Sequence, residues 1–380
     1  MHIDKIETFV LEEKLSKRFY FSQWAYESRK ICVVKITSSS GEIGWGEGYG
    51  PAEIVASGIK YLTPIVLNNS PLENELIWSK MYRASLDFAR RGVLMASVSA
   101  IDIAVWDLKG KILGCPVSVL LGGVQRKKIR PYATGFYFSN LESPFDGFEE
   151  EAKKYIAKGF KAMKMKVGLG VDIDYKIVSR IREIVGPDIQ LMVDSNHAYN
   201  YREALALAHR LEPLQISWFE EPLSPEFYGQ SYDLRQQTTI SIASGECEYL
   251  RFGFNQLLQN KSVDIVQPDI CACGGLTEAK RIASLATTHG VSIIPHTWGS
   301  GIALHVATHF IANLECIPGR LIAPDFLIEY DQTENAIRDQ LTSEIEMKNG
   351  YINVPNRPGL GFEMNTTALK KMTLVHEQFT

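Results

Sequence analysis

Six ionisable residues in the second half of the chain recur at nearly even spacing. They are Lys166, Asp194, Glu220, Glu246, Asp269 and His296. They are separated by 28, 26, 26, 23 and 27 residues, and each lies at or just after the end of a short apolar run. This is the spacing of a strand–helix unit, and in a closed barrel of eight such units the carboxyl ends of the strands meet on one face. We therefore expect the six side chains to converge on one pocket, as catalytic residues do.

Three of these residues are carboxylates that would end successive strands: Asp194, Glu220 and Glu246. Oxygen ligands from neighbouring strand ends, with water and substrate completing the shell, suit a hard octahedral cation such as Mg²⁺. These three positions do not offer the mixture of histidine and cysteine that is typical of zinc. One acidic strand end is uninformative, but three in register, opposite a pair of lysines, favour a Mg²⁺ site.

Two further groups in this set could move protons. Lys164 and Lys166 lie two residues apart in a strand pattern, so their side chains share a face. Neighbouring ammonium groups lower each other's proton affinity, which would let one of them act as a base. Asp269 and His296 would end strands six and seven, where a carboxylate can orient an imidazole and raise its basicity. We expect Lys166 and His296 to be two bases on opposite faces of a substrate.

Four other residues are candidates for substrate contacts: Glu315, Asn196, His197 and Trp298. Glu315 is placed at the presumed end of strand eight, where a protonated carboxyl group could donate to a substrate oxygen. His197 is expected to contact either the substrate or the metal ligands, and Trp298 either to wall the pocket or to support the barrel.

A histidine pair elsewhere in the chain is not expected to bind metal. His305 and His309 lie four residues apart in a helical pattern, but the glutamate of a zinc-protease motif is missing. We assign both to packing.

Short apolar runs would supply the barrel strands. They lie at 130–133, 162–167, 190–193, 216–219, 240–243, 265–267, 292–294 and 313–316. Helical patterns separate them, for example at 179–185, 203–211 and 276–289. Alternating strands and helices predict a parallel sheet, and eight strands are the number that closes into a barrel.

The first third of the chain has a different pattern. Alternating or β-branched segments at 3–10, 31–36 and 43–47 predict an antiparallel meander, and the apolar spacing at 99–110 predicts a helix. We expect an α+β capping domain at 1–127, completed by the tail from about 345 to 380, and a barrel domain at 128–344.

Composition excludes several classes of function. The formal net charge is −4, and there is no basic run of the kind that binds nucleic acid. No apolar stretch approaches the length of a membrane span, and the first residues lack the pattern of a signal peptide. Six scattered cysteines are typical of reduced thiols. We expect a cytoplasmic protein that binds neither nucleic acid nor membrane.

Several motifs bring the chain close to a known family. They are Gly-Trp-Gly-Glu at 44–47, the helix at 99–110, Lys-Met-Lys at 164–166, Val-Asp-Ser-Asn-His at 193–197, Trp-Phe-Glu-Glu-Pro at 218–222, Gly-Glu at 245–246, Gln-Pro-Asp at 267–269 and Pro-His-Thr-Trp-Gly at 295–299. In these stretches, which span almost the whole chain, it resembles the enolase superfamily, in its mandelate racemase-like branch. The resemblance implies an α+β cap over a modified TIM barrel, (β/α)₇β, a Mg²⁺ cofactor and a homo-oligomeric assembly.

Within that branch the chain is similar to sugar-lactone cycloisomerases. The similar stretches are 130–135, 271–275, 295–300 and 329–331. This implies Mg²⁺-dependent removal of the proton α to the carboxylate of a sugar acid lactone, followed by β-elimination that opens the ring to a 3-deoxy-2-keto acid. Acid-sugar dehydratases share the same machinery, so dehydration of an aldonate or aldarate is the alternative. A racemase or epimerase and a non-catalytic binding protein are weaker alternatives. Substrate choice is expected to lie in cap segments 19–26 and 47–51.

Overall fold

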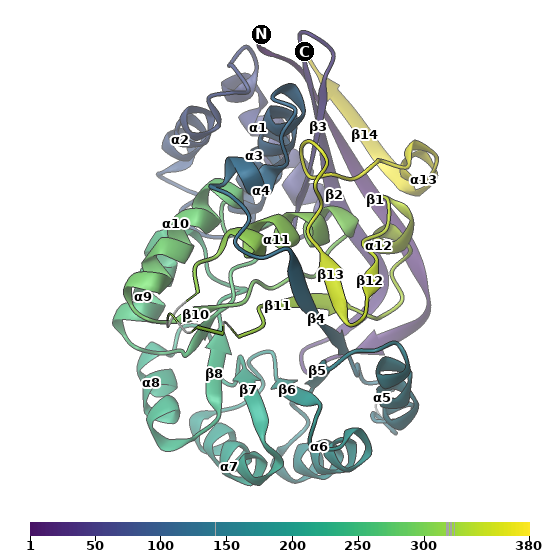
Figure 1. The fold of residues 1–380 in the computed structure, drawn as a ribbon, viewed down its shortest axis with the longest axis vertical. Helices are drawn as coiled ribbons and strands as arrows, with labels where there is room; N and C mark the ends of the chain where they lie inside the picture. The colour runs from purple at the N-terminus through teal and green to yellow at the C-terminus, as the bar shows by residue number, and fades with distance from the viewer. Residues whose placement is uncertain (141, 317–318, 320, 323) are drawn as a thin grey trace.

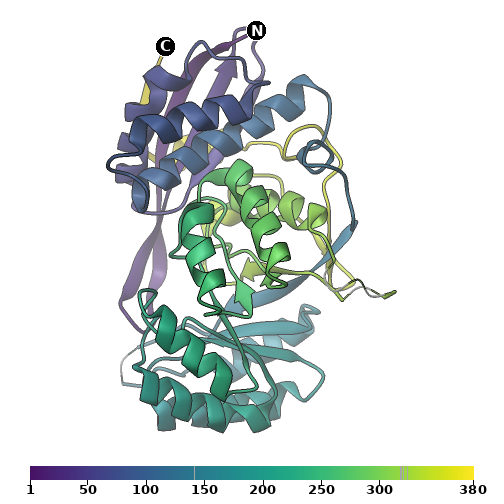
Figure 2. The same ribbon diagram turned by 90° about the vertical axis from the view of Figure 1, so that its left-hand side faces the viewer.

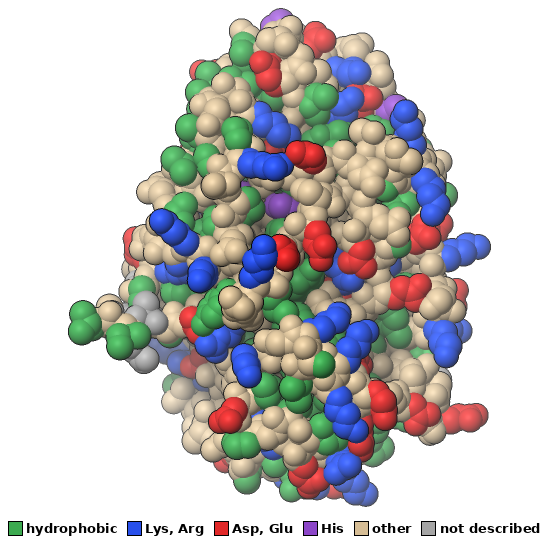
Figure 3. Space-filling model, turned by 45° about the vertical axis from the view of Figure 1, so that its right-hand side comes forward, with side chains coloured by type: hydrophobic (Ala, Val, Ile, Leu, Met, Phe, Trp, Pro, Cys, Tyr) green, Lys and Arg blue, Asp and Glu red, His purple; other side chains and the backbone are tan. Residues whose placement is uncertain are grey.

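The computed structural model describes all residues except 141, 317–318, 320 and 323. It divides into a sheet-and-helix layer at the top of Figure 1 and a ring of strands and helices below. Within the described ranges no helix is both long and apolar enough to cross a bilayer. Positive and negative side chains are interspersed on the face that Figure 3 shows.

The cap is built on a four-stranded antiparallel sheet in the order β14-β1-β2-β3. The strands are β1 (Ile3–Tyr20), β2 (Ala25–Ser38), β3 (Ile43–Gly48) and β14 (Thr373–Phe379). Three helices follow in the chain: α1 (Ala52–Val66), α2 (Asn74–Ser85) and α3 (Val93–Ile112). The helices lie against the sheet, as Figure 2 shows. Apolar side chains from the helices and the sheet form a core of their own. A single turn of helix, α4 (Val117–Leu120), leads into the barrel.

Eight parallel strands form the barrel sheet. They are β4 (Lys128–Gly135), β5 (Ala162–Lys166), β6 (Gln190–Asp194), β7 (Ile216–Glu220), β8 (Ser241–Ser244), β9 (Ile265–Val266), β10 (Ser292–Ile293) and β11 (Leu327–Asp331). The sheet runs in chain order from β4 to β10, and β11 pairs with β4, so the last strand lies beside the first. The fold is therefore the expected modified TIM barrel with an α+β cap.

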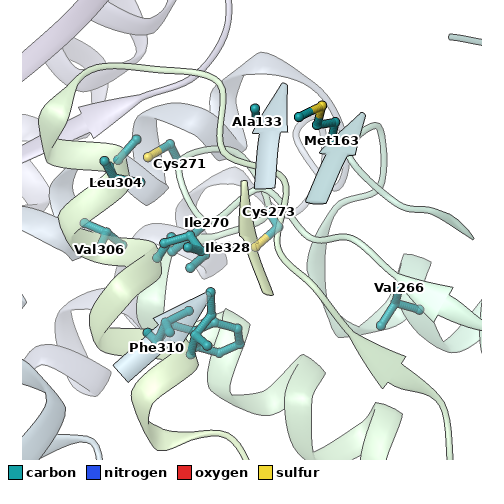
Figure 4. Close-up of a cluster of buried hydrophobic side chains, with 14 of the residues drawn as sticks. Ala133, Met163, Val266, Ile270, Cys271, Cys273, Leu304, Val306, Phe310 and Ile328 are labelled. Carbon is teal, nitrogen blue, oxygen red and sulfur yellow. The ribbon is translucent and has the colours of Figure 1, made fainter. Parts of the chain in front are cut away.

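Seven helices connect these strands, which gives (β/α)₇β. They are α5 (Phe148–Ala157), α6 (Val171–Val185), α7 (Tyr201–Leu211), α8 (Tyr228–Gln237), α9 (Leu250–Gln259), α10 (Gly275–Thr288) and α11 (Gly301–Asn313). Outward-facing strand residues pack under the helices, as Figure 4 shows for Ile328 of β11 and Phe310 of α11.

The eighth predicted strand, 313–316, is wrong. Helix α11 continues to Asn313, and the strand that pairs with β4 begins at Leu327. A short apolar run suits a buried helix end as well as a strand, and α11 is buried on nearly every side.

The tail also divides differently from the expectation. A hairpin of β12 (Met347–Lys348) and β13 (Tyr351–Asn353) pairs with β4 of the barrel. A five-residue helix, α12 (Ala336–Gln340), precedes this hairpin. The last part of the tail, α13 (Thr366–Met372) and β14, contacts strand β1 of the cap sheet.

Glycines on β3 allow α3 to lie directly on the cap sheet. A Cβ atom on Gly46 would stand 2.0 Å from the carbonyl oxygen of Ala100 and 2.8 Å from the backbone nitrogen of Ala104. Both are backbone atoms of α3, so neither can turn away. The contact explains the glycine pair in the Gly-Trp-Gly-Glu motif, because any side chain there would lift the helix off the strand.

We therefore expect Gly46→Ala to lower the free energy of unfolding by about 1–3 kcal/mol, the usual cost of overpacking. Denaturant unfolding would measure the loss. Gly229→Ala is the matched control, because no heavy atom lies within 4 Å of the Cβ that it adds. Equal stability of Gly46→Ala and wild type would contradict the packing explanation.

The histidines of α11 serve packing, as the sequence indicates. His309 is fully buried; its Nδ1 accepts from the backbone N–H of Ser118 at 3.1 Å, and its Nε2 donates to the carbonyl of Leu360 at 3.1 Å. The neutral ring therefore has both partners it needs, whereas a proton on Nδ1 would face the N–H of Ser118. Burial lowers the pKa of His309 to about 4.

This pKa predicts a loss of stability in acid. The unfolded chain binds the proton near pH 6.5, whereas the folded chain binds it only near pH 4, so the free energy of unfolding should fall between these values by about 3 kcal/mol for this group. Chemical denaturation across pH 4–7 would measure the slope. His309→Gln should flatten it, and His289→Gln, an exposed control, should not.

Candidate active site

The inside of the barrel is filled by an apolar layer. Its members come from seven strands: Tyr132, Ala162, Met192, Trp218, Ala243, Ile265 and Leu327. Alternate residues of a strand point to the same side, so the residues two positions further along point into the barrel as well. Six of these are polar: Thr134, Lys164, Asp194, Glu220, Gln267 and Glu329. A polar layer therefore lies directly above the apolar one, toward the carboxyl ends of the strands.

Lys164 is the centre of this polar layer. Its side chain is 1% exposed, and its Nζ contacts Glu220 Oε1, Glu329 Oε1 at 2.9 Å and Asp194 Oδ2 at 3.6 Å. Burial alone would lower the pKa of Lys164, but the carboxylates of Glu220 and Glu329 hold it well above its usual value. Lys164 is therefore a fixed positive charge.

Lys166 lies one layer higher on the same strand. Its Nζ donates to Asp194 Oδ2 at 2.6 Å and to Asn196 Oδ1 at 2.8 Å. The sequence predicts a lowered pKa from the neighbouring Lys164, and in this geometry that is wrong. Burial and Lys164 do lower the pKa of Lys166, but Asp194 raises it by more, so it lies above the ordinary value.

The three expected metal ligands stand at the ends of β6, β7 and β8, but they face different partners. Asp194 faces the lysines, which together outweigh burial and lower its pKa. Glu220 accepts from Trp218 Nε1 at 2.9 Å and from Gln267 Nε2 at 2.7 Å, and burial raises its pKa to about 7 although Lys164 opposes the shift. Glu246 Oε2 lies 3.3 Å from His296 Nε2. All three offer only oxygen, which suits a hard cation.

A different trio of side chains comes closer together. Of the residues that the structure describes, His197, Glu221 and Cys247 form the one group of three whose ligand atoms all lie within 4.8 Å of one another. They follow the same three strands, β6, β7 and β8, that carry or precede the expected Mg²⁺ ligands.

His296 and Asp269 form the expected pair. His296 Nδ1 donates to Asp269 Oδ2 at 2.7 Å, and the other carboxylate oxygen accepts from the backbone N–H of Cys271 at 2.7 Å. This fixes the ring with Nε2 toward Glu246. Burial alone would lower the pKa of His296, but Glu246 and Asp269 raise it to about 10.

A cavity of about 230 Å³ connects these groups with the cap. Barrel residues at its wall include Lys166, Glu246 and His296. Lys166 ends β5 and His296 follows β10, and four strands lie between β5 and β10 in the sheet order. The cap segments expected to choose the substrate contribute seven further residues, four of them aromatic: Phe21, Gln23, Trp24, Tyr26, Tyr49, Gly50 and Pro51.

The structure places three of the four predicted substrate contacts at this cavity. Asn196, His197 and Trp298 line it. Trp298 stacks on Tyr137 with ring centroids 5.2 Å apart, and the guanidinium of Arg29 lies 4.0 Å from the centre of its ring. Trp298 therefore walls the pocket and also joins the cap to the barrel.

The fourth candidate, Glu315, is misplaced. It is exposed and follows α11, away from the end of strand eight. The carboxylate of that strand that contacts Lys164 is Glu329, which the sequence reasoning missed. It accepts from Thr134 Oγ1 at 2.6 Å and from the backbone N–H of Thr297 at 2.9 Å. Burial would raise its pKa, but Lys164 and His296 lower it to about 2, so it is ionised. The alternation of side chains in Leu327, Ile328 and Glu329 is the sequence feature that could have identified this strand and its inward-facing carboxylate.

The Asp269 contact should control the proton affinity of His296. In Asp269→Asn the amide cannot supply the negative charge, so the pKa of His296 should fall toward the ordinary range of histidine. NMR titration of the His296 ring in protein freed of divalent cations would measure it. Glu315→Gln removes an equal charge at an exposed site and should leave the titration unchanged. An unaltered titration in Asp269→Asn would show that this pair does not set the basicity.

Comparison with known proteins agrees with this architecture. Residues 5–122 match the mandelate racemase / muconate lactonizing enzyme N-terminal domain, and residues 147–368 match the enolase C-terminal domain-like family. D-galactarolactone cycloisomerase of Agrobacterium fabrum is 39% identical over 376 residues, which cover 98% of this chain and 99% of the relative.

Two solved structures share the whole fold. The 3,6-anhydro-D-galactonate cycloisomerase from Zobellia galactanivorans is 50% identical, with a TM-score of 0.90 over 98% of this chain and 99% of that one. An L-talarate/galactarate dehydratase mutant liganded with Mg and L-glucarate is 25% identical, with a TM-score of 0.88 over 99% and 93%. The chain belongs to the mandelate racemase / muconate lactonizing enzyme family of the enolase superfamily.

Proposed function

We propose that this chain is a Mg²⁺-dependent cycloisomerase that opens the ring of a cyclic sugar acid by removing the proton α to the carboxylate and expelling the β-oxygen of the ring. The observation that carries this proposal is one cavity holding two proton-transfer groups, Lys166 and His296, from strands far apart in the sheet, next to carboxylates on neighbouring strand ends. The two cycloisomerases similar to this chain support a ring-opening reaction.

Asp194, Glu220 and Glu246 would hold the Mg²⁺ ion. Their all-oxygen donor set and their places at the ends of three neighbouring strands fit a hard cation. When bound, the ion would neutralise the substrate carboxylate and the negative charge that develops on it as the α-proton leaves.

Lys166 and His296 would handle the protons. A base must reach the α-carbon, and both side chains reach the cavity. In its neutral form, Lys166 Nζ or His296 Nε2 would take the proton, depending on the configuration at the α-carbon; Asp269 holds the imidazole in place. Lys164 keeps its positive charge beneath the site. The fixed orientation of both groups lowers the entropy cost of proton transfer.

The ring then opens without loss or gain of atoms. The electrons of the broken C–H bond form the C=C bond of an enol, and the C–O bond at the β-carbon breaks toward the ring oxygen. That oxygen takes a proton, and the enol becomes a 2-keto-3-deoxy acid. The aromatic wall formed by Tyr26, Tyr137 and Trp298 suits the C–H face of a compact ring. Both an aldarolactone and an anhydro-aldonate carry the required β-oxygen.

Dehydration of a linear sugar acid is the second candidate. The same α-proton removal followed by loss of a β-hydroxyl gives a 2-keto-3-deoxy acid and water. His296, which Asp269 orients, can in its protonated form donate to the departing hydroxyl. The magnesium-liganded dehydratase structure of the same fold supports this alternative.

A panel of sugar acids separates the two candidates. The protein is incubated with Mg²⁺ and with galactarolactone, 3,6-anhydro-galactonate, galactarate and galactonate, and 2-keto acids are detected with semicarbazide. Product from the cyclic acids alone is the expected result, since the ring oxygen is the leaving group. Product from the linear acids alone would establish dehydration, and α-proton exchange in D₂O without keto acid would establish epimerisation.

Variants test the assigned residues. Lys166→Ala and His296→Asn should each lower turnover by about 10²–10⁴-fold for at least one substrate configuration. Glu329→Gln should also impair turnover, because it removes a carboxylate from Lys164, whereas Glu315→Gln, on the surface, should leave the rate unchanged. Wild-type rates in a Lys166/His296 double variant, or full activity after chelation of divalent ions, would refute the mechanism.

A further inference from the structure

A second set of ligand atoms lies beside the proposed Mg²⁺ site. His197, Glu221 and Cys247 follow β6, β7 and β8, and one ligand atom from each lies within 4.8 Å of the other two. We propose that these three residues form a site for a divalent cation that accepts nitrogen and sulfur ligands, such as Zn²⁺ or Co²⁺. The proposal rests on the geometry of this trio and is independent of the reaction proposed above.

The orientation of His197 is the first argument. Its Nδ1 lies 3.1 Å from the carbonyl oxygen of Leu223. A carbonyl can only accept a hydrogen bond, so Nδ1 carries the proton and Nε2 of the neutral ring has a free lone pair. That lone pair faces Glu221 Oε2 at 3.1 Å and Cys247 Sγ at 3.5 Å. A metal-binding histidine is commonly held in this way, with its other nitrogen donating to a carbonyl.

The same geometry excludes a nucleophilic relay. In a cysteine–histidine–carboxylate triad the carboxylate binds the nitrogen that does not face the sulfur. Here the thiol and the carboxylate both face Nε2, while Nδ1 is engaged by Leu223. A nitrogen lone pair, a carboxyl group and a thiol therefore converge here, and a cation that displaces the thiol proton would be held by all three.

Glu221 supplies an independent observation. Glu221 is 1% exposed, and its Oε1 has no hydrogen-bond partner among the described residues. Its Oε2 has a long contact of 3.4 Å from Asn196 Nδ2 and faces His197 Nε2, and the thiol of Cys247 lies within hydrogen-bond reach of the same carboxyl group. A buried carboxylate oxygen without a partner is costly, and a bound dication would compensate for it.

The trio is also accessible. Cys247 is exposed, and both His197 and Cys247 line the cavity of about 230 Å³. An ion can therefore enter from solvent, and a fourth ligand position would open toward the cavity, as in zinc sites that keep one exchangeable position. Binding would convert the Cys247 thiol to a thiolate and release its proton to solvent.

The experiment uses Co²⁺ as a spectroscopic probe. The protein is saturated with Mg²⁺, so that the all-oxygen site is filled, and titrated with Co²⁺ while the thiolate-to-cobalt absorption in the near ultraviolet is followed. We expect one equivalent of Co²⁺ to bind with this absorption. Cys247→Ser should remove the absorption and weaken binding by about 10–100-fold. His197→Gln should weaken binding while the thiol remains.

Cys115→Ser is the matched control, since it removes a partly exposed thiol that is not in the trio, and it should retain the absorption. Absorption that persists in Cys247→Ser would overturn the proposal. So would wild-type protein that binds no Co²⁺ with this absorption, because His197 and Glu221 would then form an imidazolium–carboxylate ion pair only. Circular dichroism and thermal unfolding would confirm that each variant is folded.

Discussion

The buried ammonium group of Lys164 is the interaction on which the barrel interior depends. Three carboxylates converge on it from β6, β7 and β11, and none of them can reach bulk water. Removing one partner of a buried ion pair costs about 3–5 kcal/mol, so each carboxylate needs this cation and the cation needs them. Because β11 closes the strand order against β4, the contact between Lys164 and Glu329 also joins the second barrel strand to the last.

This polar layer is stable only because an apolar layer underlies it and aromatic cap loops cover it. Trp218, in the apolar layer, donates a hydrogen bond to the carboxyl group of Glu220, and Gln267 donates a second one to the same oxygen. On the other side, the cap sheet places Tyr26 and Tyr49 at the wall of the cavity. The sheet is supported by α3, which the glycines of β3 allow to pack in backbone contact with the strand. Arg29 of β2 adds a fixed link, with its Nη2 2.8 Å from Asp331 Oδ2 and its guanidinium over Trp298.

The sequence predicts most of this arrangement where local periodicity and spacing agree. Seven of the eight barrel strands lie where apolar runs and the 23–28-residue rhythm place them. The sequence misplaces strand eight because the end of α11 is as apolar as a strand, and β11 begins only at Leu327, which breaks the even spacing. With the strand misplaced, Glu329 is not recognised as a residue of the site. Sequence reasoning also does not give the raised pKa of Lys166, because its direction depends on the contact of Lys166 Nζ with Asp194 Oδ2 at 2.6 Å, whose effect exceeds that of the like charge of Lys164.

Two ligand-type side chains follow each other at the carboxyl end of β7 and again just after β8, and this succession would let the two proposed ligand sets share one end of the barrel. Glu220 points into the barrel, as the alternation along its strand requires. Glu221 adopts a positive φ of 45°, and its carboxyl group lies beside the ring of His197. Glu246 faces His296, whereas Cys247 faces His197. One set is all oxygen and lies against lysines; the other combines nitrogen, oxygen and sulfur and opens to the cavity. The change of direction at a strand end turns consecutive side chains toward different partners. Residues only one position apart would therefore belong to two sites, one preferring hard cations and the other softer ones.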